Sequence, residues 1–329
     1  MRRTRRGYRQ DGFILIVVLG AVLMLSALLF GFNQRSRSSL DKADGFYRTE
    51  QAWDGAWAGV QIAVATIRDV NDICTDPQFA KLLRGENTFS LEDANCAITI
   101  AEENGLLNVN RLKSEDGELD RRRIDQFLRL IDQLNRQQKD SQRIGYGILP
   151  CVIDWIDGDD DVTCLPFVKQ ENTGAEDGYY GMRPQPYSCR NRPVDSLDEL
   201  RWVKGMTSQS FCLLRPFLTC VGDGKININA APKLVIQSLS EQIDAALAEM
   251  IVNQRKLRPF RTTMELRNIP GMTDKIHRSF RDSITISPAE RFYRITSQGR
   301  VQDHKCTIEA LLRRNTQAGT VDIVQYREQ

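Results

Sequence analysis

The hydrophobic pattern sets the first 32 residues apart from the rest of the chain. An unbroken apolar run extends from Phe13 to Phe32 and contains no charged side chain. About 20 helical residues are needed to span the hydrocarbon layer of a membrane. The residues before the run include five arginines, Arg2, Arg3, Arg5, Arg6 and Arg9. Because positively charged flanks stay in the cytoplasm, we expect one membrane-spanning helix with a cytoplasmic N-terminus and an exported remainder.

Two other interpretations of this run are weaker. A cleaved secretory signal has a shorter apolar segment and a cleavage site of small residues, whereas Asn33-Gln34-Arg35-Ser36-Arg37 follows the run here. A core helix seldom needs to be apolar on all sides directly after a group of arginines. The pattern therefore favours a membrane helix.

Helical periodicity continues beyond the apolar run. Apolar residues recur at helical spacing between residues 40 and 67, and no proline interrupts residues 13–70. We predict one continuous helix over residues 13–70, about 87 Å long. Two helices broken near Asp44-Gly45 are the alternative, because glycine destabilises a helix interior.

Alternating residues predict a first hairpin after this helix. Residues 96–100 alternate toward Asn104-Gly105, and residues 106–110 follow. Asn-Gly between two such runs is typical of a tight hairpin turn. A related phrase returns at residues 224–232, where Asn229 is placed to cap a helix that begins around Pro232.

A second hairpin is predicted near the end of the sequence. Residues 292–296 and 307–311 alternate and are joined by a polar segment around Gly299. Strands on either side of a long middle segment predict a sheet interrupted by an insertion. The fold class that we expect is α+β.

The inserted segment contains an internal repeat. Residues 196–206 (SLDELRWVKGM) align with residues 262–272 (TTMELRNIPGM). Each copy opens with a predicted capping box, Ser196 with Glu199 and Thr262 with Glu265. Each copy closes on Gly-Met, as a short helix does at a tight turn. The phrase resembles half of a helix-hairpin-helix motif, which in other proteins holds DNA phosphates through backbone amides.

Charge argues against DNA as the ligand of this repeat. The chain has a net charge of +2 with 27% charged residues, which is too balanced to indicate a nucleic-acid partner. Acidic Asp195, Asp198 and Glu199 crowd the first copy. We therefore favour a helical packing unit and expect no nucleic-acid partner. An exported, membrane-tethered protein that binds DNA for uptake is the alternative function.

Cysteine usage agrees with export. All eight cysteines follow the apolar run, and an even number in an oxidising compartment favours disulfides. The sequence has no C-x-x-C pair and two histidines, so a zinc site is the weaker interpretation. Short-range closure favours three pairs out of the many that are possible: Cys74–Cys96, Cys151–Cys164 and Cys212–Cys220.

Clustered carboxylates form the strongest candidate for chemistry. Residues 153–161 (IDWIDGDDD) and residues 174–180 (GAEDGYY) are rich in Asp and Glu. Such clusters suit an oxygen-ligated cation such as calcium, although the spacing does not fit an EF-hand. A solvated acidic loop held by Cys151 and Cys164 is the alternative.

Catalysis is not expected. His277 and His304 lie in no recognisable motif, and the sequence contains neither G-x-S-x-G nor H-E-x-x-H. Several carboxylates in one loop are more typical of a cation site than of an acid–base pair with separated pKa values. We predict that the protein is not an enzyme.

The segment around Gly12 resembles the leader junction of type IV pilins and type II secretion pseudopilins. This resemblance implies that a prepilin peptidase cleaves after Gly12 and methylates Phe13. Most members of that family carry Glu as the fifth mature residue, whereas this chain has Val17 there. In the family, that Glu is thought to neutralise the terminal amine of the subunit above, since an unpaired charge at the membrane is costly. A subunit with Val17 therefore suits the tip of a filament.

Among pseudopilins, the chain resembles the minor pseudopilin family called general secretion pathway protein K. The phrases that carry this resemblance are residues 154–157, residues 174–180 and residues 226–232. It implies a pilin-like long N-terminal helix packed on an antiparallel sheet, with a large, mainly helical insertion that contains helix-hairpin-helix-like (SAM-like) modules. The family's acidic loop binds calcium, and its motif maps the candidate ligands to Asp157, Asp159, Asp161, Glu176 and Asp177. Asp154 is expected to be a capping or structural residue.

The resemblance also implies an organisation and a role. We expect a leader (1–12), an assembly helix with the first strands of the pilin-like domain (13–102), an inserted helical domain with the acidic loop (103–222), a second helical module (223–281) and C-terminal strands (282–329). The expected function is to cap the periplasmic pseudopilus and to initiate its assembly for export across the outer membrane. The implied partners are other minor pseudopilins, the major pseudopilin below, the prepilin peptidase and the inner membrane. The bulk of the chain is expected in the periplasm.

Overall fold

The computed structural model describes residues 11–70, 83, 85, 87–91, 94–114, 116–168 and 172–328. Most of the leader expected at residues 1–12, and Cys74, lie outside these residues. The helices are α1 (Asp11–Asp69), α3 (Arg121–Asn135), α4 (Ile148–Ile156), α5 (Asp177–Tyr180), α6 (Ser208–Leu214), α7 (Lys233–Ser238), α8 (Ala245–Leu257) and α9 (Asp274–Phe280). The strands are β1 (Asn87–Leu91), β2 (Ala94–Glu102), β3 (Leu107–Asn108), β4 (Leu218–Thr219), β5 (Ile226–Asn227), β6 (Ile284–Thr285), β7 (Glu290–Val301), β8 (His304–Asn315) and β9 (Val321–Glu328).

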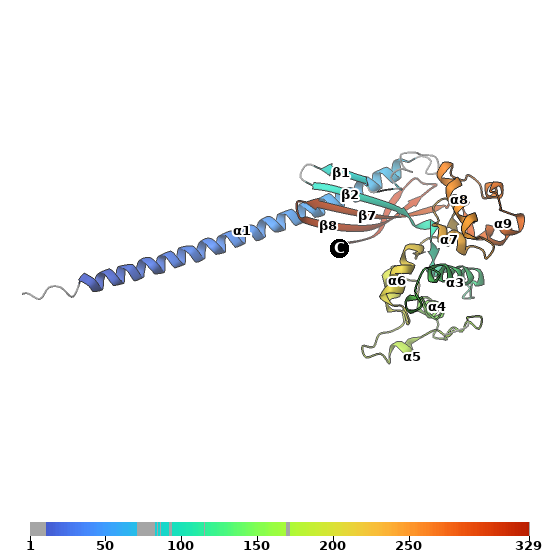
Figure 1. Cartoon of the computed structure of the whole chain (residues 1–329), viewed down its shortest axis with the longest axis horizontal. Helices are drawn as coiled ribbons and strands as arrows, with labels where there is room; N and C mark the ends of the chain where they lie inside the picture. Colours follow the sequence, from blue (N-terminus) through green and yellow to red (C-terminus); the bar gives the residue numbers. More distant parts are fainter. Residues whose placement is uncertain are drawn as a thin grey trace, which may run out of the picture.

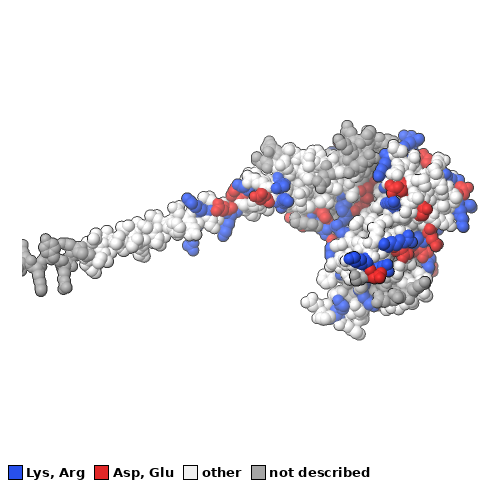
Figure 2. Space-filling model, in the orientation of Figure 1, with Lys and Arg blue, Asp and Glu red and all other residues white. Residues whose placement is uncertain are grey.

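Helix α1 is a single continuous rod of 59 residues, which confirms the predicted long helix. The break considered near Asp44-Gly45 does not occur, because Gly45 lies inside the helix. The first half of α1 projects away from the rest of the molecule (Figure 1). Its side chains from Phe13 to Phe32 are exposed, and its most apolar window has a mean hydropathy of 3.0. Figure 2 shows no charged side chain along this apolar stretch. Length and composition fit a single membrane anchor.

The second half of α1 packs on a five-stranded sheet. Ala52, Ala56, Val60, Ala63 and Ile67 recur every three or four residues and are fully or almost fully buried. They contact a core supplied mainly by β2, β7 and β8. The strand order is β1-β2-β7-β8-β9, and every neighbouring pair is antiparallel. The sheet therefore joins strands from both sides of the insertion, as predicted.

The second predicted hairpin is confirmed as β7–β8, but its turn was misplaced. The chain reverses between Val301 and His304, where Gln302 has a φ of 52°. Gly299 instead lies inside β7, where a Cβ atom would come within 1.9 Å of the Ala52 carbonyl oxygen on α1. This glycine is needed for close approach of helix and strand and does not form the turn.

The first predicted hairpin is wrong. Strand β2 pairs with β1 and β7, whereas β3 pairs in parallel with the distant β4. The Asn104 side chain accepts from the Phe292 amide and donates to the Glu290 carbonyl, and a Cβ on Gly105 would lie 2.6 Å from the Ala230–Ala231 backbone. Asn-Gly here serves long-range packing in a short 3-10 turn (Glu103–Gly105).

The insertion consists of two modules built to one plan. We define the first module as residues 107–219 and the second module as residues 226–285. Each begins with a two-residue strand and two helices, continues through a 3-10 helix and another helix, and ends in a second strand that pairs in parallel with the first. The 3-10 helices are Leu197–Trp202 and Thr263–Asn268. In Figure 1 the second module sits beyond the end of the sheet, and the first lies below it.

One asparagine side chain in each module, which we call the asparagine clamp, joins two distant segments of that module. The Asn110 side chain donates to the Val194 carbonyl at 2.9 Å and accepts from the Val194 amide at 2.8 Å. The Asn229 side chain makes the same two bonds to Phe260, both at 2.9 Å. Asn229 was predicted to cap α7, which is wrong: the N-cap of α7 is Pro232, without a side-chain cap. Its amide is used instead to hold two distant segments together.

The two hairpin-like turns are also matched. Gly205 and Gly271 both adopt a positive φ, which glycine tolerates best, and Thr207 and Thr273 cap the helices that follow. The capping box predicted at Ser196 is confirmed. The one predicted at Thr262 is wrong, because the Thr262 side chain makes no capping bond. The two modules share one continuous hydrophobic core, separate from that of the sheet. The domain limits expected from the sequence stay predictions.

Candidate metal centre

The acidic loop is a long segment that only the first module carries. It runs from Asp157, the C-cap of α4, to Pro193. Every residue of α4 is buried, so the carboxylates of its last turn, Asp154 and Asp157, start from inside the module. The loop folds back to place Glu176 against them. The helix thus fixes one side of the candidate site and the returning loop fixes the other.

Three of the five predicted ligands come together. One carboxylate oxygen from each of Asp157, Asp159 and Glu176 lies within 4.8 Å of the others. Asp157 and Glu176 are buried, and Asp159 is exposed. We call these three residues the acidic cluster. Glutamate and aspartate oxygens at this spacing are the donors that a hard divalent cation prefers.

The other two predicted ligands are engaged elsewhere. The backbone amide of Asp161 donates to Asp159 Oδ1 at 3.0 Å, and the Asp161 residue is exposed. Asp177 accepts a hydrogen bond from the Cys189 amide and begins α5. The structure therefore places both residues next to the acidic cluster in sequence but does not bring their carboxylates into it.

Asp154 has the structural role that was expected. Its Oδ1 accepts from the Thr163 amide at 2.9 Å and so fixes the start of the loop. Gly174 lies directly against this carboxylate, since a Cβ there would come within 1.9 Å of Asp154 Oδ2. Gly174 therefore allows the returning strand of the loop to pass close to α4.

Lys113 is the residue that sequence reasoning missed. Its Nζ lies 2.6 Å from Asp157 Oδ2 and 3.2 Å from Asp159 Oδ2. Burial lowers the pKa of Lys113, but the bonds and charges of the two aspartates outweigh burial and leave the pKa raised. The ammonium group thus neutralises part of the negative charge of the acidic cluster, as a bound cation would. No local signal indicates this contact, because Lys113 precedes the loop by more than 40 residues.

One ammonium does not satisfy all the buried carboxylates. Among the described residues, Glu176 Oε1 and Oε2, Asp157 Oδ1 and Asp154 Oδ2 are buried and have no hydrogen-bond partner. Burial, with the charges of Asp154 and Asp157, raises the pKa of Glu176 to about 8. Burial likewise raises the pKa values of Asp154 and Asp157. Buried oxygens without donors are costly, so the residues present fit an additional cation.

No disulfide crosses the acidic loop among the residues that the structure describes. Cys164 is an exposed free thiol, so the predicted Cys151–Cys164 bond is not formed, and the buried Cys151 sulfur lies 3.9 Å from the Thr173 carbonyl. Cys212 and Cys220 are free as well, because Cys212 is exposed on α6 while the Cys220 thiol donates to the Asp195 carbonyl. Cys96 is a free thiol beside Ser297. The predicted partner of Cys96, Cys74, lies outside the described residues.

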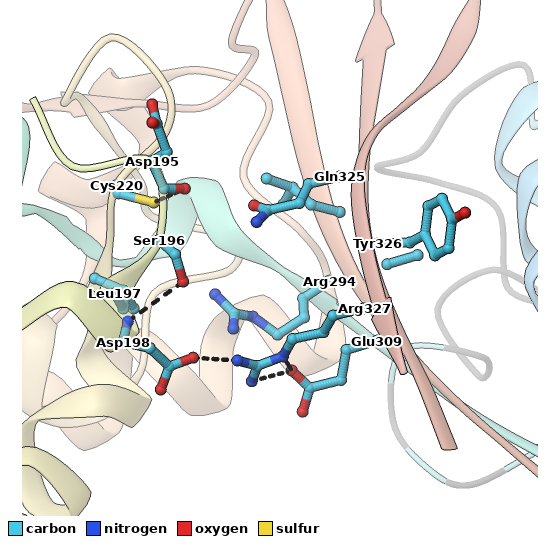
Figure 3. Close-up of a pocket in the computed structure, with 12 residues that line it drawn as sticks. Asp195, Ser196, Leu197, Asp198, Cys220, Arg294, Glu309, Gln325, Tyr326 and Arg327 are labelled. Atoms are coloured by element: carbon cyan, nitrogen blue, oxygen red, sulfur yellow. Dashed lines mark hydrogen bonds and ion pairs between the residues drawn. The ribbon is translucent and has the colours of Figure 1, made fainter. Parts of the chain in front are cut away.

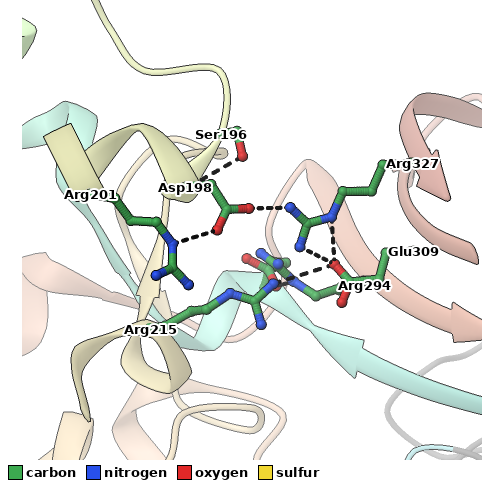
Figure 4. A network of polar contacts seen from close by, with 8 residues as sticks. Ser196, Asp198, Arg201, Arg215, Arg294, Glu309 and Arg327 are labelled. Carbon is green, nitrogen blue, oxygen red and sulfur yellow. Dashed lines mark hydrogen bonds and ion pairs between the residues drawn. The ribbon is translucent and has the colours of Figure 1, made fainter. Parts of the chain in front are cut away.

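The first module is tied to the sheet by a network of charges. Arg327 on β9 binds Asp198 of the first repeat copy and Glu309 on β8 (Figure 4). Arg215 also pairs with Glu309, at 3.3 Å. Burial raises the pKa of Asp198, but the bonds of Arg327 and Arg201 outweigh it, so the pKa lies below its usual range. Figure 3 shows residues that line a small hollow beside this network. The hollow has a volume of about 50 Å³, which is too small for a ligand site.

The predicted leader junction lies at the start of α1. Gly12 and Phe13 are helical, and the side chains of Phe13 and Val17 are exposed along the rod. Cleavage after Gly12 and methylation of Phe13 stay predictions. The exposed side chain of Val17 thus lies on the surface of the apolar segment.

Comparison with known proteins assigns the insertion to a family. Sequence profiles described as "Type II secretion system (T2SS), protein K" match residues 105–223 and residues 226–287. The chain belongs to the type II secretion system protein K family. The two matched segments coincide closely with the first and second modules. The chain is therefore a minor pseudopilin, a structural component of protein secretion.

Curated members of the protein K family extend the match over nearly the whole chain. The chain is 24% identical to the type II secretion system protein K of Pseudomonas aeruginosa over 323 residues, which is 94% of this chain and 90% of that protein. The Aeromonas hydrophila protein is also 24% identical, over 67% of this chain and 66% of its own length. The Klebsiella pneumoniae protein is 22% identical over 80% of this chain and 77% of its own length.

A solved structure confirms the fold. A chain in the crystal structure of the GspK-GspI-GspJ complex from enterotoxigenic Escherichia coli superposes with a TM-score of 0.64 and 18% identity. The match covers 90% of this chain and 99% of that one. The predicted α+β fold, with a long N-terminal helix, an antiparallel sheet and a largely helical insertion, is confirmed.

Proposed function

We propose that this minor pseudopilin caps the tip of the periplasmic pseudopilus and initiates its assembly, in support of protein export across the outer membrane. The observation that carries this proposal is Val17, which stands where a subunit inside a filament would need a carboxylate. A chain with Val17 has no group to neutralise the amine of a subunit above it. It loses nothing at the tip. The two modules support a cap, because they add bulk at the end of the molecule far from the membrane.

We propose that the partners at the tip are two other minor pseudopilins, with the major pseudopilin below. The similar Escherichia coli chain is named as part of a three-component complex. Leu40, Phe46 and Tyr47 form exposed apolar surface on α1 between the membrane segment and the sheet, which fits lateral packing against other such helices. The proposed placement is the inner membrane, with one span, a cytoplasmic N-terminus processed by prepilin peptidase and the bulk of the chain in the periplasm. The proposed role is structural, without catalysis or nucleic-acid binding.

Labelling of isolated pseudopili tests the cap. An epitope inserted at Gly319, in the exposed turn between β8 and β9, marks the subunit without touching a core. We expect label at one end of each pseudopilus. Val17→Glu should reduce end labelling, whereas Val17→Leu, which also lacks a carboxylate, should retain it. Label along the whole filament, or end labelling unchanged by Val17→Glu, contradicts the proposal.

We also propose that the acidic cluster binds a calcium ion through Asp157, Asp159 and Glu176. The proposal is supported by the buried oxygens that lack donors and by a donor set made only of carboxylates. A bound divalent cation supplies positive charge to Glu176 and Asp157, and no catalytic step is implied. Its proposed role is to hold the acidic loop onto α4.

Thermal unfolding in calcium and in a chelator tests this site. At a free calcium concentration 100 times the Kd, binding to the folded chain stabilises it by about 2.7 kcal/mol. Glu176→Gln should abolish this gain, while Glu241→Gln, which changes an exposed acid of the second module, should keep it. Equal stability in calcium and in chelator would show that the acidic cluster is a solvated loop instead.

A further inference from the structure

The second module carries an open groove. The groove lies between one face of α8, with Met250, Gln254 and Leu257, and the segment 268–270, which begins with the last residue of the 3-10 helix. Its volume is about 580 Å³. Leu257 is 84% exposed at its edge, which is unusual for a leucine at the end of a helix in a packed module. A surface of this kind suggests a missing partner.

The first module shows what such a groove accommodates. Residues 192–219 align with residues 258–285 without a gap, beginning with Arg-Pro in both copies. Trp202-Val203-Lys204 therefore correspond to Asn268-Ile269-Pro270. Each of these segments begins with the last residue of a 3-10 helix and leads into a glycine of positive φ, Gly205 or Gly271. The walls of the groove thus have direct counterparts in the first module.

In the first module, tyrosines of the acidic loop fill the corresponding space. The Tyr187 hydroxyl donates to the Trp202 carbonyl at 2.8 Å, and the Tyr180 hydroxyl accepts from the Lys204 amide at 3.2 Å. The Tyr180 ring packs edge-on against Trp155 of α4, with ring centroids 5.1 Å apart, and is fully buried. We call Tyr180 and Tyr187 the tyrosine plug.

The second module has no segment of its own to act as a plug. Its chain passes from Leu257 at the end of α8 directly into Arg258-Pro259, whereas the first module inserts the acidic loop at this point. Pro270 also replaces Lys204 and lacks the amide that binds Tyr180. Asn268 aligns with Trp202, so its backbone carbonyl is the counterpart of the Trp202 carbonyl. A tyrosine seated as Tyr187 is seated therefore fits the open groove.

Charge at the rim further defines the occupant. Arg258 lines the groove, and no ion pair to it occurs among the described residues. The acid in the lining, Glu265, accepts from the Arg261 amide at 3.1 Å. Figure 2 shows Lys and Arg side chains interspersed with Asp and Glu over the outer end of the second module. An exposed guanidinium without an ion pair attracts a carboxylate, so a carboxylate near the tyrosine of the occupant would complement Arg258.

We propose that the groove of the second module docks an extended segment of a partner protein that presents a tyrosine next to carboxylates. The tyrosine enters between α8 and residues 268–270 and donates to the Asn268 carbonyl, while a carboxylate pairs with Arg258. The tyrosine contact repeats, between two chains, the bond from Tyr187 to the Trp202 carbonyl that the first module makes within one chain; the pair with Arg258 is an additional contact.

A peptide that copies residues 176–188 (EDGYYGMRPQPYS) provides the probe. Fluorescence anisotropy of the labelled peptide is followed as the full-length chain is added in detergent. Leu257→Asp should weaken binding at least tenfold, because it places a charge on the apolar edge. Met264→Asp, a matched change at a 55% exposed position outside the groove, should leave the affinity within twofold. Both sites are exposed, so neither change is expected to disturb folding.

The peptide itself is then varied. Replacing both of its plug tyrosines by alanine should abolish binding, and Tyr187→Phe should weaken binding about two- to tenfold through loss of one hydrogen bond. Absence of binding by the parent peptide, or equal binding by the wild-type chain and the Leu257→Asp variant, overturns the proposal. Self-association of the chain that Leu257→Asp removes also overturns it, since the occupant would then be a second copy.

Discussion

The two modules of the insertion share a frame and differ in what is attached to it. Both use an asparagine clamp, a glycine of positive φ, a threonine cap and a two-residue parallel ladder. The first adds the acidic loop, and the second leaves the same place open. The two modules are therefore held together by the same kinds of bonds and turns, whereas the candidate metal site belongs to a segment that only the first module carries.

The difference extends to how each module meets the sheet. Asp198 of the first module pairs with Arg327, whereas Met264 takes the corresponding position in the second module and is exposed. The second module is attached through β5, where the Asn227 side chain donates to Glu102 at 2.6 Å. Equivalent positions have thus been adapted to different neighbours.

The asparagine clamps give the largest expected effect. Asn110→Ala removes three side-chain hydrogen bonds, two to Val194 and one to the Cys220 carbonyl, and Asn229→Ala removes two. Each change leaves the amide and the carbonyl of the clamped residue, Val194 or Phe260, without these partners. We expect each change to lower the free energy of unfolding by about 2–4 kcal/mol, as measured by urea denaturation. If the modules share one frame, the two losses should be similar. A large loss at one clamp and none at the other would break the comparison.

The pH dependence of the free energy of unfolding gives the second largest expected effect, and it should come from the acidic cluster of the first module. The Glu176 pKa of about 8 lies above the ordinary value of 4.5, so its contribution to stability is full below pH 4.5 and is lost as pH rises through 8. In chelator, we expect the free energy of unfolding to fall by roughly 1–3 kcal/mol between pH 5 and pH 8.

The test variant for this series is Glu176→Gln. Because the amide does not ionise, the free energy of unfolding of this variant should fall less between pH 5 and pH 8. Asp154 and Asp157, whose pKa values are also raised, leave a residual slope in the same direction. The Glu249→Gln variant of the second module should keep the full fall. Identical slopes in all three proteins would contradict the assignment of this pH dependence to the acidic cluster.

Lys113 gives the smallest expected effect. Its ammonium group occupies part of the acidic cluster, so Lys113→Met should raise calcium affinity about three- to tenfold by removing a competing cation. Isothermal titration calorimetry measures this change. Lys233→Met, which removes an exposed pair with Glu249 on the second module, should leave calcium affinity unchanged. Weaker binding in Lys113→Met would instead make Lys113 a positioning residue.

Local signals in the sequence predicted much of this fold. Apolar periodicity predicted α1 to within two residues at its start and one at its end. This works because the buried face of a helix carries an apolar residue every three or four positions. The β7–β8 hairpin and the repeated turns were also found from local patterns. These elements depend on residues close together in sequence.

Contacts between distant segments escaped sequence reasoning. Asn104-Gly105 was predicted to be a hairpin turn, but Asn104 binds Phe292 on β7 and Gly105 packs against Ala230-Ala231 in the second module. Gly299 is required by its close approach to the α1 backbone. Lys113 reaches the acidic cluster from the start of the first module. The family motif grouped five acidic residues, of which the structure brings the carboxylates of Asp157, Asp159 and Glu176 together. It did not distinguish them from Asp161 and Asp177, whose backbone and side-chain bonds lie elsewhere. Calcium binding stays a prediction.

The unbroken course of α1 has a mechanical consequence. The same helix that enters the apolar segment also packs into the sheet, with no hinge between the two. If the membrane end of α1 moves along the helix axis, the sheet and the modules therefore move with it by the same distance. Insertion of four residues near Gly45 would lift the head by about 6 Å and turn it by about 40°. The length of the helix therefore sets both the distance of the modules from the membrane and their rotation about the helix axis.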